Sequence, residues 1–158
     1  MSSCRSIRIS IIVPIFLFIV FMGLGLSGNA DPIPPEVSEF AGDWPLPNKD
    51  YENSRATFDS QISSSNVSNL SVAWSFPIPG TSAFGAAASN PIIVGNKVYL
   101  QDLRCNVFCL DLQRGETLWS KLYNVSGIIG PNGPAVGLGK VFVASDLYNI
   151  TALDANTG

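Results

Sequence analysis

Residues 106–119 read NVFCLDLQRGETLW, and residues 149–158 read NITALDANTG. The two stretches share an asparagine, a leucine–aspartate pair and a glycine at a constant offset of 43 residues. The matched residues are Asn106 with Asn149, Leu110 with Leu153, Asp111 with Asp154, and Gly115 with Gly158. The same offset places residues 97–100 on residues 140–143 without a gap. A period of about 40 to 50 residues, built from short runs of β-forming residues, is typical of a β-propeller blade.

Short strands and tight turns follow one another in both copies of the repeat. The first copy predicts four strands, at residues 91–94, 97–101, 106–110 and 116–122. The second copy predicts three, at residues 134–136, 140–144 and 149–153. Gly95-Asn96 is typical of a two-residue hairpin turn. We therefore predict an all-β fold without a long helix, in which residues 54–158 are the N-terminal blades of a propeller.

Only about two blades are present, and a closed propeller needs about 4 to 8. We therefore predict that this chain is a fragment of a larger ring, whose remaining blades come from missing sequence or from other chains. Two blades leave one wide face uncovered, and stacked repeats need about three units for stability. The segment alone is expected to aggregate or to associate.

The first 30 residues differ in kind from the rest of the chain. Two arginines precede residues 11–26, which carry no charge, and small residues end the leader at Ala30. This order is typical of a secretory signal peptide cleaved before Asp31. A membrane anchor over residues 9–26 is the alternative, because the length of the apolar run lies between the two classes. Both interpretations predict a secreted, periplasmic or cell-surface protein.

Three segments connect the leader to the first blade. Residues 31–53 carry five prolines and several acids, and they predict a linker and lead-in. Residues 54–71 are polar with spaced apolar side chains, and they predict an extended cover with a short helical turn. Residues 71–76, SVAWSF, alternate in polarity and predict a strand.

The charge and the missing histidine exclude some functions. The net charge is −3 and the chain shows no basic patch, which argues against nucleic-acid binding. The chain contains no histidine, so the commonest metal ligand and general base is absent. Catalysis within this segment would depend on carboxylates, on a cofactor or on residues that follow Gly158.

Cys105 and Cys109 are the two cysteines outside the leader. We place both in one strand, where a spacing of four residues puts them on the same face. They would then lie about 13 Å apart, which is too far for a disulfide. We interpret them as small apolar core residues, and a bond to a later cysteine is the alternative.

The repeated stretches resemble the blade motif of the quinoprotein family, which in words is x-[VIL]-x-A-L-D-x-x-T-G-x-x-x-W. Each conserved type in that motif has a physical role here. Gly115 and Gly158 allow the left-handed backbone of a tight turn. Asp111 and Asp154 can accept hydrogen bonds from turn amides, and Trp119 offers a large flat surface for packing one blade on the next.

The lead-in provides a second resemblance, to the N-terminal pattern of alcohol dehydrogenases that depend on pyrroloquinoline quinone (PQQ). The matching residues are Trp44, Asp50, Tyr51, Arg55, Ile62, Asn66, Val67, Leu70 and Trp74. Together the two resemblances cover about residues 44–158. They imply a quinoprotein-type β-propeller that oxidises an alcohol or a sugar with PQQ. They also imply that the calcium ligands and the catalytic aspartate come from later blades.

The resemblance implies cofactor residues at three places, and this sequence departs from the family pattern at each. The family's glutamate falls on Ala88, and its adjacent pair of cysteines falls within residues 126–131. The family's arginine falls on Asn132, which is followed by the matching Gly133. Asn132 and Gly133 are therefore the candidate cofactor-binding residues. The sequence leaves the catalytic residues unknown, and we predict no metal ligand in this segment.

Other conspicuous side chains favour structural roles. We interpret Trp44, Trp74 and Trp119 as blade-packing residues rather than as a stacking surface for a cofactor. We interpret Asp102, Asp111, Asp146 and Asp154 as turn-forming residues rather than as calcium ligands. Sequons for N-glycosylation begin at Asn66, Asn69, Asn124 and Asn149.

Two functions stay open. The first is an exported oxidoreductase that oxidises alcohols or sugars with PQQ held in the propeller channel. The second is a non-catalytic extracytoplasmic propeller that binds protein or glycan. The lead-in favours the first function, and the departures at Ala88 and Asn132 favour the second for this segment.

Overall fold

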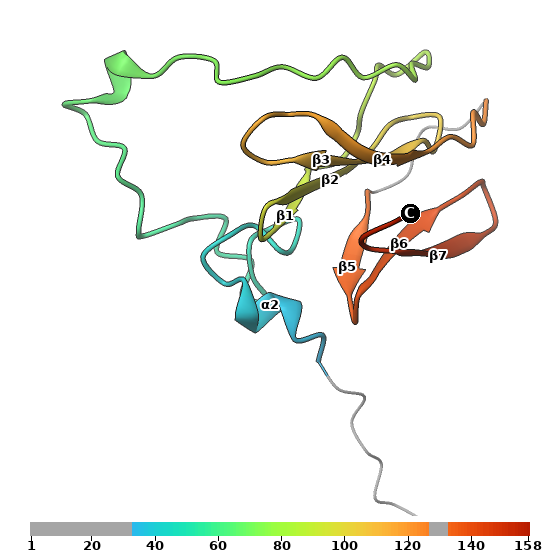
Figure 1. The fold of residues 1–158 in the computed structure, drawn as a ribbon, viewed down its shortest axis with the longest axis horizontal. Coiled ribbons are helices and arrows are strands. Elements are labelled where there is room, and N and C mark those ends of the chain that lie inside the picture. Colours follow the sequence, from blue (N-terminus) through green and yellow to red (C-terminus); the bar gives the residue numbers. More distant parts are fainter. Residues whose placement is uncertain (1–32, 127–132) are drawn as a thin grey trace, which may run out of the picture. The chain divides into compact units, whose positions relative to one another are not determined.

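A computed structural model describes residues 33–126 and 133–158, and the strands within them lie in two antiparallel sheets (Figure 1). Both sheets belong to one unit, Pro34–Gly158. The predicted leader, residues 1–30, lies outside the described residues, and so does Asn132. No helix within the described ranges is long and apolar enough to span a membrane.

The first sheet contains four strands in sequence order: β1 (Ile92–Val94), β2 (Lys97–Gln101), β3 (Val107–Asp111) and β4 (Thr117–Lys121). Each strand pairs antiparallel with the next. Gly95 forms the turn between β1 and β2 at a φ of 60°, a value that glycine adopts without steric cost. The predicted four-stranded blade is confirmed.

The second sheet contains β5 (Ala135–Gly137), β6 (Lys140–Ala144) and β7 (Ile150–Asp154) in the same order. Its register repeats that of the first sheet: Phe142 pairs with Ala152, as Tyr99 pairs with Cys109. The turn between β5 and β6 consists of Leu138 and Gly139, since Gly137 is the last residue of β5 and pairs with Lys140. The offset of 43 residues therefore describes hydrogen-bonded pairs as well as residue types.

The two sheets share one hydrophobic core, because strand alternation turns one face of each toward the other. The first sheet contributes Ile92, Tyr99, Val107, Cys109 and Trp119, and the second contributes Val136, Val141, Val143 and Leu153. The Tyr99 hydroxyl donates to the Ala155 carbonyl at 3.0 Å, across the core. The two predicted blades therefore pack face to face.

The opposite face of the second sheet is open in this chain. Phe142 and Ile150 lie on it, with exposed fractions of 39% and 78%. The offset maps them onto Tyr99 and Val107, which are buried against the second sheet. The same face is therefore buried in the first sheet and exposed in the second sheet, where a further blade would cover it.

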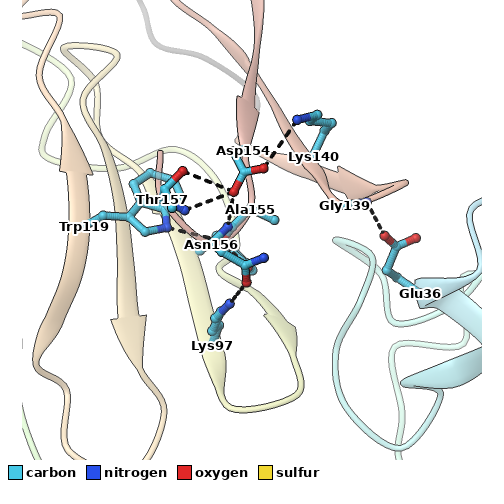
Figure 2. Close-up of polar contacts among 10 residues, drawn as sticks. Glu36, Lys97, Trp119, Gly139, Lys140, Asp154, Ala155, Asn156 and Thr157 are labelled. Atoms are coloured by element: carbon cyan, nitrogen blue, oxygen red, sulfur yellow. Dashed lines mark hydrogen bonds and ion pairs between the residues drawn. The ribbon is translucent and has the colours of Figure 1, made fainter.

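Two tryptophans pack on glycine turns in the same way. The Trp119 indole donates its Nε1–H to the Ala155 carbonyl at 3.2 Å (Figure 2). The ring also lies against Gly158. The Trp74 indole donates to the Leu112 carbonyl at 2.9 Å and lies against Gly115. A Cβ atom on either glycine would come within 3 Å of the ring above it. The interpretation of both tryptophans as blade-packing residues is confirmed.

The N-terminal part of the unit has little regular structure. It contains the short helix α2 (Glu36–Glu39) and the 3-10 turn η1 (Val67–Asn69). The strand predicted at residues 71–76 is wrong, because this segment is extended but pairs with no strand among the described residues. Residues 31–53 were predicted to be a linker and lead-in. The Glu36 carboxylate in this segment nevertheless accepts a hydrogen bond from the backbone N–H of Gly139 at 2.7 Å (Figure 2). Backbone bonds to Glu36 hold its pKa below the usual value despite the desolvation that raises it.

Cys105 corrects one prediction. It lies at a φ of 63° in the turn before β3, so it does not share a strand face with Cys109. The cause is Asp102, whose carboxylate accepts hydrogen bonds from the backbone N–H groups of Arg104 and Asn106 and thereby closes the turn. Both thiols are free and buried, and burial raises the pKa of Cys109 to about 11.

The contact between Trp74 and Gly115 predicts a difference between two glycine substitutions. Gly115 and Gly139 have nearly equal φ values, 70° and 69°, but only Gly115 has a neighbour within 4 Å of an added Cβ. Gly139→Ala should cost about 1–2 kcal/mol from backbone strain. Gly115→Ala should cost roughly 1–3 kcal/mol more, because its Cβ meets the Trp74 ring. Thermal unfolding measures both, and equal losses would contradict the contact.

Leu138 predicts a stabilising substitution. It occupies the β5–β6 turn at a φ of 55° and is 57% exposed, so the turn holds a leucine where asparagine is favoured. Leu138→Asn should raise the free energy of unfolding by roughly 1 kcal/mol. Leu122→Asn is the matched control, because Leu122 is equally exposed and does not have a positive φ. A loss of stability in Leu138→Asn would contradict the assignment of backbone strain to Leu138.

Candidate functional site

The candidate site lies at the end of the two sheets where their first strands begin. The register puts the start of β1, the end of β2, the start of β3 and the end of β4 at this same end of the first sheet. Strand β1 contacts β5, so the segments that precede these two strands meet here. They are residues 88–91 and 133–134, which contain the positions that the family resemblance singled out.

Gly133 contacts the segment before β1. It has a φ of 97°, and a Cβ atom on it would lie 2.6 Å from the Ser89 Cβ and 2.8 Å from the Ser89 Oγ. The offset of 43 residues maps Gly133 onto Asn90, so equivalent corners of two successive blades touch. Glycine is therefore required here for close packing. This contact is a sufficient reason for Gly133 without a ligand.

The other predicted positions provide few groups for a ligand. Ala88 is exposed and its methyl side chain cannot donate a hydrogen bond. Of residues 126–131 only Ser126 is described, and Asn132 lies outside the described residues. The structure therefore brings Gly133 next to Ser89 and leaves the role of Asn132 as a prediction.

Arg104 is a side chain at this end that the sequence interpretation missed. It lines a cavity of about 330 Å³ together with residues 81–84, Leu103 and residues 125–126. Its guanidinium donates to the backbone carbonyls of Val125 and Asn124 at 3.4 and 3.3 Å. These bonds tie the β2–β3 loop to the segment after β4. No motif in the sequence signals this role, because the contact joins loops about twenty residues apart.

Buried hydrogen bonds of Asp102 and Asn106 also connect the β2–β3 loop to the segment after β4. The Asp102 carboxylate is fully buried and accepts from the side-chain amide of Asn106 at 2.9 Å. The Asn106 side-chain carbonyl in turn accepts from the backbone N–H groups of Tyr123 and Asn124, both at 2.9 Å. Gly80 packs so closely on the Asp102 carboxylate that a Cβ there would overlap it. Asp102 is therefore a structural residue with no open side for a metal ion.

The remaining candidate aspartates are bound in turns. Asp146 accepts from the Asn149 side chain and from the backbone N–H of Tyr148, and these bonds hold its pKa below the usual value. Asp154 accepts from the backbone N–H groups of Asn156 and Thr157, which lower its pKa in the same way (Figure 2). Asp111 closes the equivalent turn of the first repeat, through the N–H groups of residues 113 and 114. Their interpretation as turn-forming residues is confirmed.

The described residues at this end offer few groups for an anionic quinone. An anion needs donors that are free to turn toward it, and the Arg104 guanidinium uses two of its five N–H donors on backbone carbonyls. Ala88 has no polar group, and the space beside Gly133 is filled by Ser89. In the ranges that the structure describes, no three His, Cys, Asp or Glu side chains come together as a metal site.

Comparison with protein families identifies the repeat. Residues 44–158 match the PQQ family described as "Glucose/ethanol/alcohol dehydrogenase, beta-propeller domain". The chain is 33% identical over 128 residues to the lanthanide-dependent methanol dehydrogenase of Methylacidiphilum fumariolicum, and the alignment covers 74% of this chain and 20% of that protein. It is 30% identical over 124 residues to the quinohemoprotein alcohol dehydrogenase of Comamonas testosteroni, and this alignment covers 73% of this chain and 17% of that protein.

Solved structures agree with the sequence comparison. The crystal structure of the Comamonas testosteroni quinohemoprotein alcohol dehydrogenase superposes with a TM-score of 0.67 at 26% identity, over 81% of this chain and 20% of that chain. A europium-containing methanol dehydrogenase superposes with a TM-score of 0.62 at 29% identity, over 75% of this chain and 22% of that chain. This chain therefore spans about a fifth of the length of the proteins it matches.

The bound aspartates predict how stability depends on pH. The folded-state pKa values of Asp146 and Asp154 lie below the value of about 3.9 that an unfolded chain has. The unfolded chain therefore binds more protons in acid, and the stability from these groups is present above pH 4 and lost as the pH falls below it. We expect a thermal midpoint that is flat from pH 8 to 5 and falls below pH 4. The double variant Asp146→Asn and Asp154→Asn should fall less steeply, and an unchanged acid limb would contradict the assignment.

Proposed function

Because this chain belongs to the β-propeller family of PQQ-dependent glucose, ethanol and alcohol dehydrogenases, we propose that it forms the first two blades of an exported quinoprotein propeller. The family oxidises alcohols with PQQ. In our proposal residues 34–158 contribute scaffold and blade packing to that propeller. The groups that would hold PQQ and a calcium ion, and the catalytic aspartate, belong to blades beyond Gly158.

One observation carries the scaffold role. At the corner where the family places a cofactor contact, Gly133 packs against Ser89 so closely that no side chain fits between them. The same end of the first sheet is held by Asp102, Asn106 and Arg104, whose polar atoms bind backbone groups. These residues stabilise the ends of the strands on which a site could be built: the Asp102 carboxylate is buried, and the Arg104 guanidinium binds two backbone carbonyls.

Export is the second part of the proposal. A basic start, an uncharged apolar run over residues 11–26 and a small residue at Ala30 support a secretory signal, and a membrane anchor is the alternative. The sequon asparagines 66, 69, 124 and 149 are all exposed, which suits a protein that faces the outside.

The same observations support a second candidate, a non-catalytic extracytoplasmic propeller that binds protein or glycan. The departures at Ala88 and Asn132 from the family's charged residues favour it. The two candidates differ in the blades that follow: the oxidoreductase requires a channel-facing aspartate and metal ligands there, and would act on an alcohol or a sugar. The binding protein requires neither.

Titration with PQQ and calcium tests the scaffold role. Two lost charged or polar contacts, each worth about 1.5–3 kcal/mol, weaken binding on the order of a hundredfold or more. We therefore expect the 158-residue chain to show no saturable change in PQQ absorbance at micromolar concentrations. The quinohemoprotein alcohol dehydrogenase of Comamonas testosteroni, stripped of PQQ, is the positive control. Saturable submicromolar binding that Asn132→Ala abolishes would contradict the proposal and assign the site to this segment.

A further inference from the structure

The cavity beside Arg104 lies between equivalent connections of two successive repeats. One wall is formed by residues 81–84, which precede β1, and the other by residues 125–126, which follow β4. The offset of 43 residues maps residues 82–83 onto residues 125–126. Together with the β2–β3 loop these walls enclose about 330 Å³, and small-molecule sites are typically concave spaces of about 300–1,000 Å³.

Backbone hydrogen bonds hold both walls against the β2–β3 loop. The Leu103 N–H donates to the Ala86 carbonyl at 2.9 Å, and the Val125 N–H donates to the Arg104 carbonyl at 3.0 Å. The first wall is also closed on itself by a backbone bridge within residues 82–85. The shape of the cavity is therefore set by the fold and does not require a ligand.

Arg104 gives this cavity its charge, because it is the only charged residue among the described residues that line it. Its guanidinium has five N–H donors, and two of them donate to the carbonyls of Val125 and Asn124. In the described ranges no hydrogen bond or ion pair uses the other three. The nearby Asp102 carboxylate is buried and accepts from backbone N–H groups of its own turn. The cavity therefore offers cationic donors to an anion.

The rest of the lining suits an apolar body and one small polar head. The Phe84 ring is 65% exposed and Leu103 is buried beneath the cavity lining, so both offer apolar surface. Hydroxyl groups of Thr81, Ser82 and Ser126 lie on the same walls and can donate to an oxygen atom. One cation balances one negative charge, which favours a carboxylate over a doubly charged phosphate.

The second repeat shows that the loop itself does not need an arginine. It closes the corresponding loop through Asp146 and Asn149, and the offset of 43 residues places Leu147 at the position of Arg104. Arg104 is therefore a feature of one repeat and not of the scaffold that both repeats share.

We propose that this cavity binds a small organic monocarboxylate, with the Arg104 guanidinium on the carboxylate and the Phe84 ring against the apolar body. A guanidinium can bind both oxygens of a carboxylate at once, and an aromatic ring offers a large apolar contact. The inference requires neither PQQ nor a catalytic activity, so its failure would leave the proposed function untouched.

Titration of the 158-residue chain with benzoate, followed by NMR, tests the proposal. Benzamide is the matched neutral probe, because it has the same ring and no negative charge. We expect saturable shifts of the backbone amides in residues 81–84 and 125–126 with benzoate, and binding of benzamide that is at least about tenfold weaker. Arg104→Gln should weaken benzoate binding by a similar factor. The control Arg114→Gln, an exposed arginine paired with Glu116, should leave it unchanged.

Phe84→Ala provides a second variant that leaves the hydrogen bonds of Arg104 in place, in case Arg104→Gln loosens the loops. It should weaken benzoate binding severalfold while the amide spectrum outside residues 81–86 stays the same. Inorganic phosphate is the third probe and should bind more weakly than benzoate. Equal affinities for benzoate and benzamide, tighter binding of phosphate, or benzoate binding that neither variant weakens would overturn the proposal.

Discussion

The contact between a tryptophan ring and the glycine turn of the next repeat is the constraint on which the rest of the structure depends. It occurs twice, as Trp119 over Gly158 and as Trp74 over Gly115, and in both the indole N–H is bound by a carbonyl three residues before the glycine. A side chain at the glycine would displace the ring, and a buried indole without its acceptor would cost about 1–3 kcal/mol. The Trp119 contact therefore ties the first sheet to the last turn of the second, and the hydrophobic core lies between these two sheets.

The sequence predicted the strands of the two repeats well because each repeat carries its own turn signals, whereas the strand predicted at residues 71–76 was wrong. Gly95, Asp111 and Gly115 fix turns by local chemistry, so the strand boundaries agreed within one or two residues. Cys105 and Glu36 were not predicted, because their conformations depend on distant partners. The turn at Cys105 is closed by the buried Asp102 carboxylate, and helix α2 is tied to the second sheet through the N–H of Gly139. Long-range contacts of this kind leave no periodic pattern.

Part of the candidate site could likewise be located from the sequence, and part could not. The resemblance singled out Gly133 as a cofactor contact, which stays a prediction, and the structure shows that this glycine packs against Ser89, where two successive blades meet. Arg104 carries no motif, and only the fold brings it to the carbonyls of residues 124 and 125. The polar groups at this end stabilise loops, which agrees with a segment that builds the ring and leaves chemistry to other blades.

Hydrogen exchange of the three indole N–H groups, followed by NMR, tests the repeated contact most directly. The Nε1–H groups of Trp74 and Trp119 are bound by carbonyls far along the chain in sheltered positions. That of Trp44 is bound by the nearby Pro47 carbonyl in an exposed position. The account predicts exchange at Trp74 and Trp119 that is at least tenfold slower than at Trp44. Exchange at Trp74 as fast as at Trp44 would contradict the claim that both tryptophans join successive repeats in the same way.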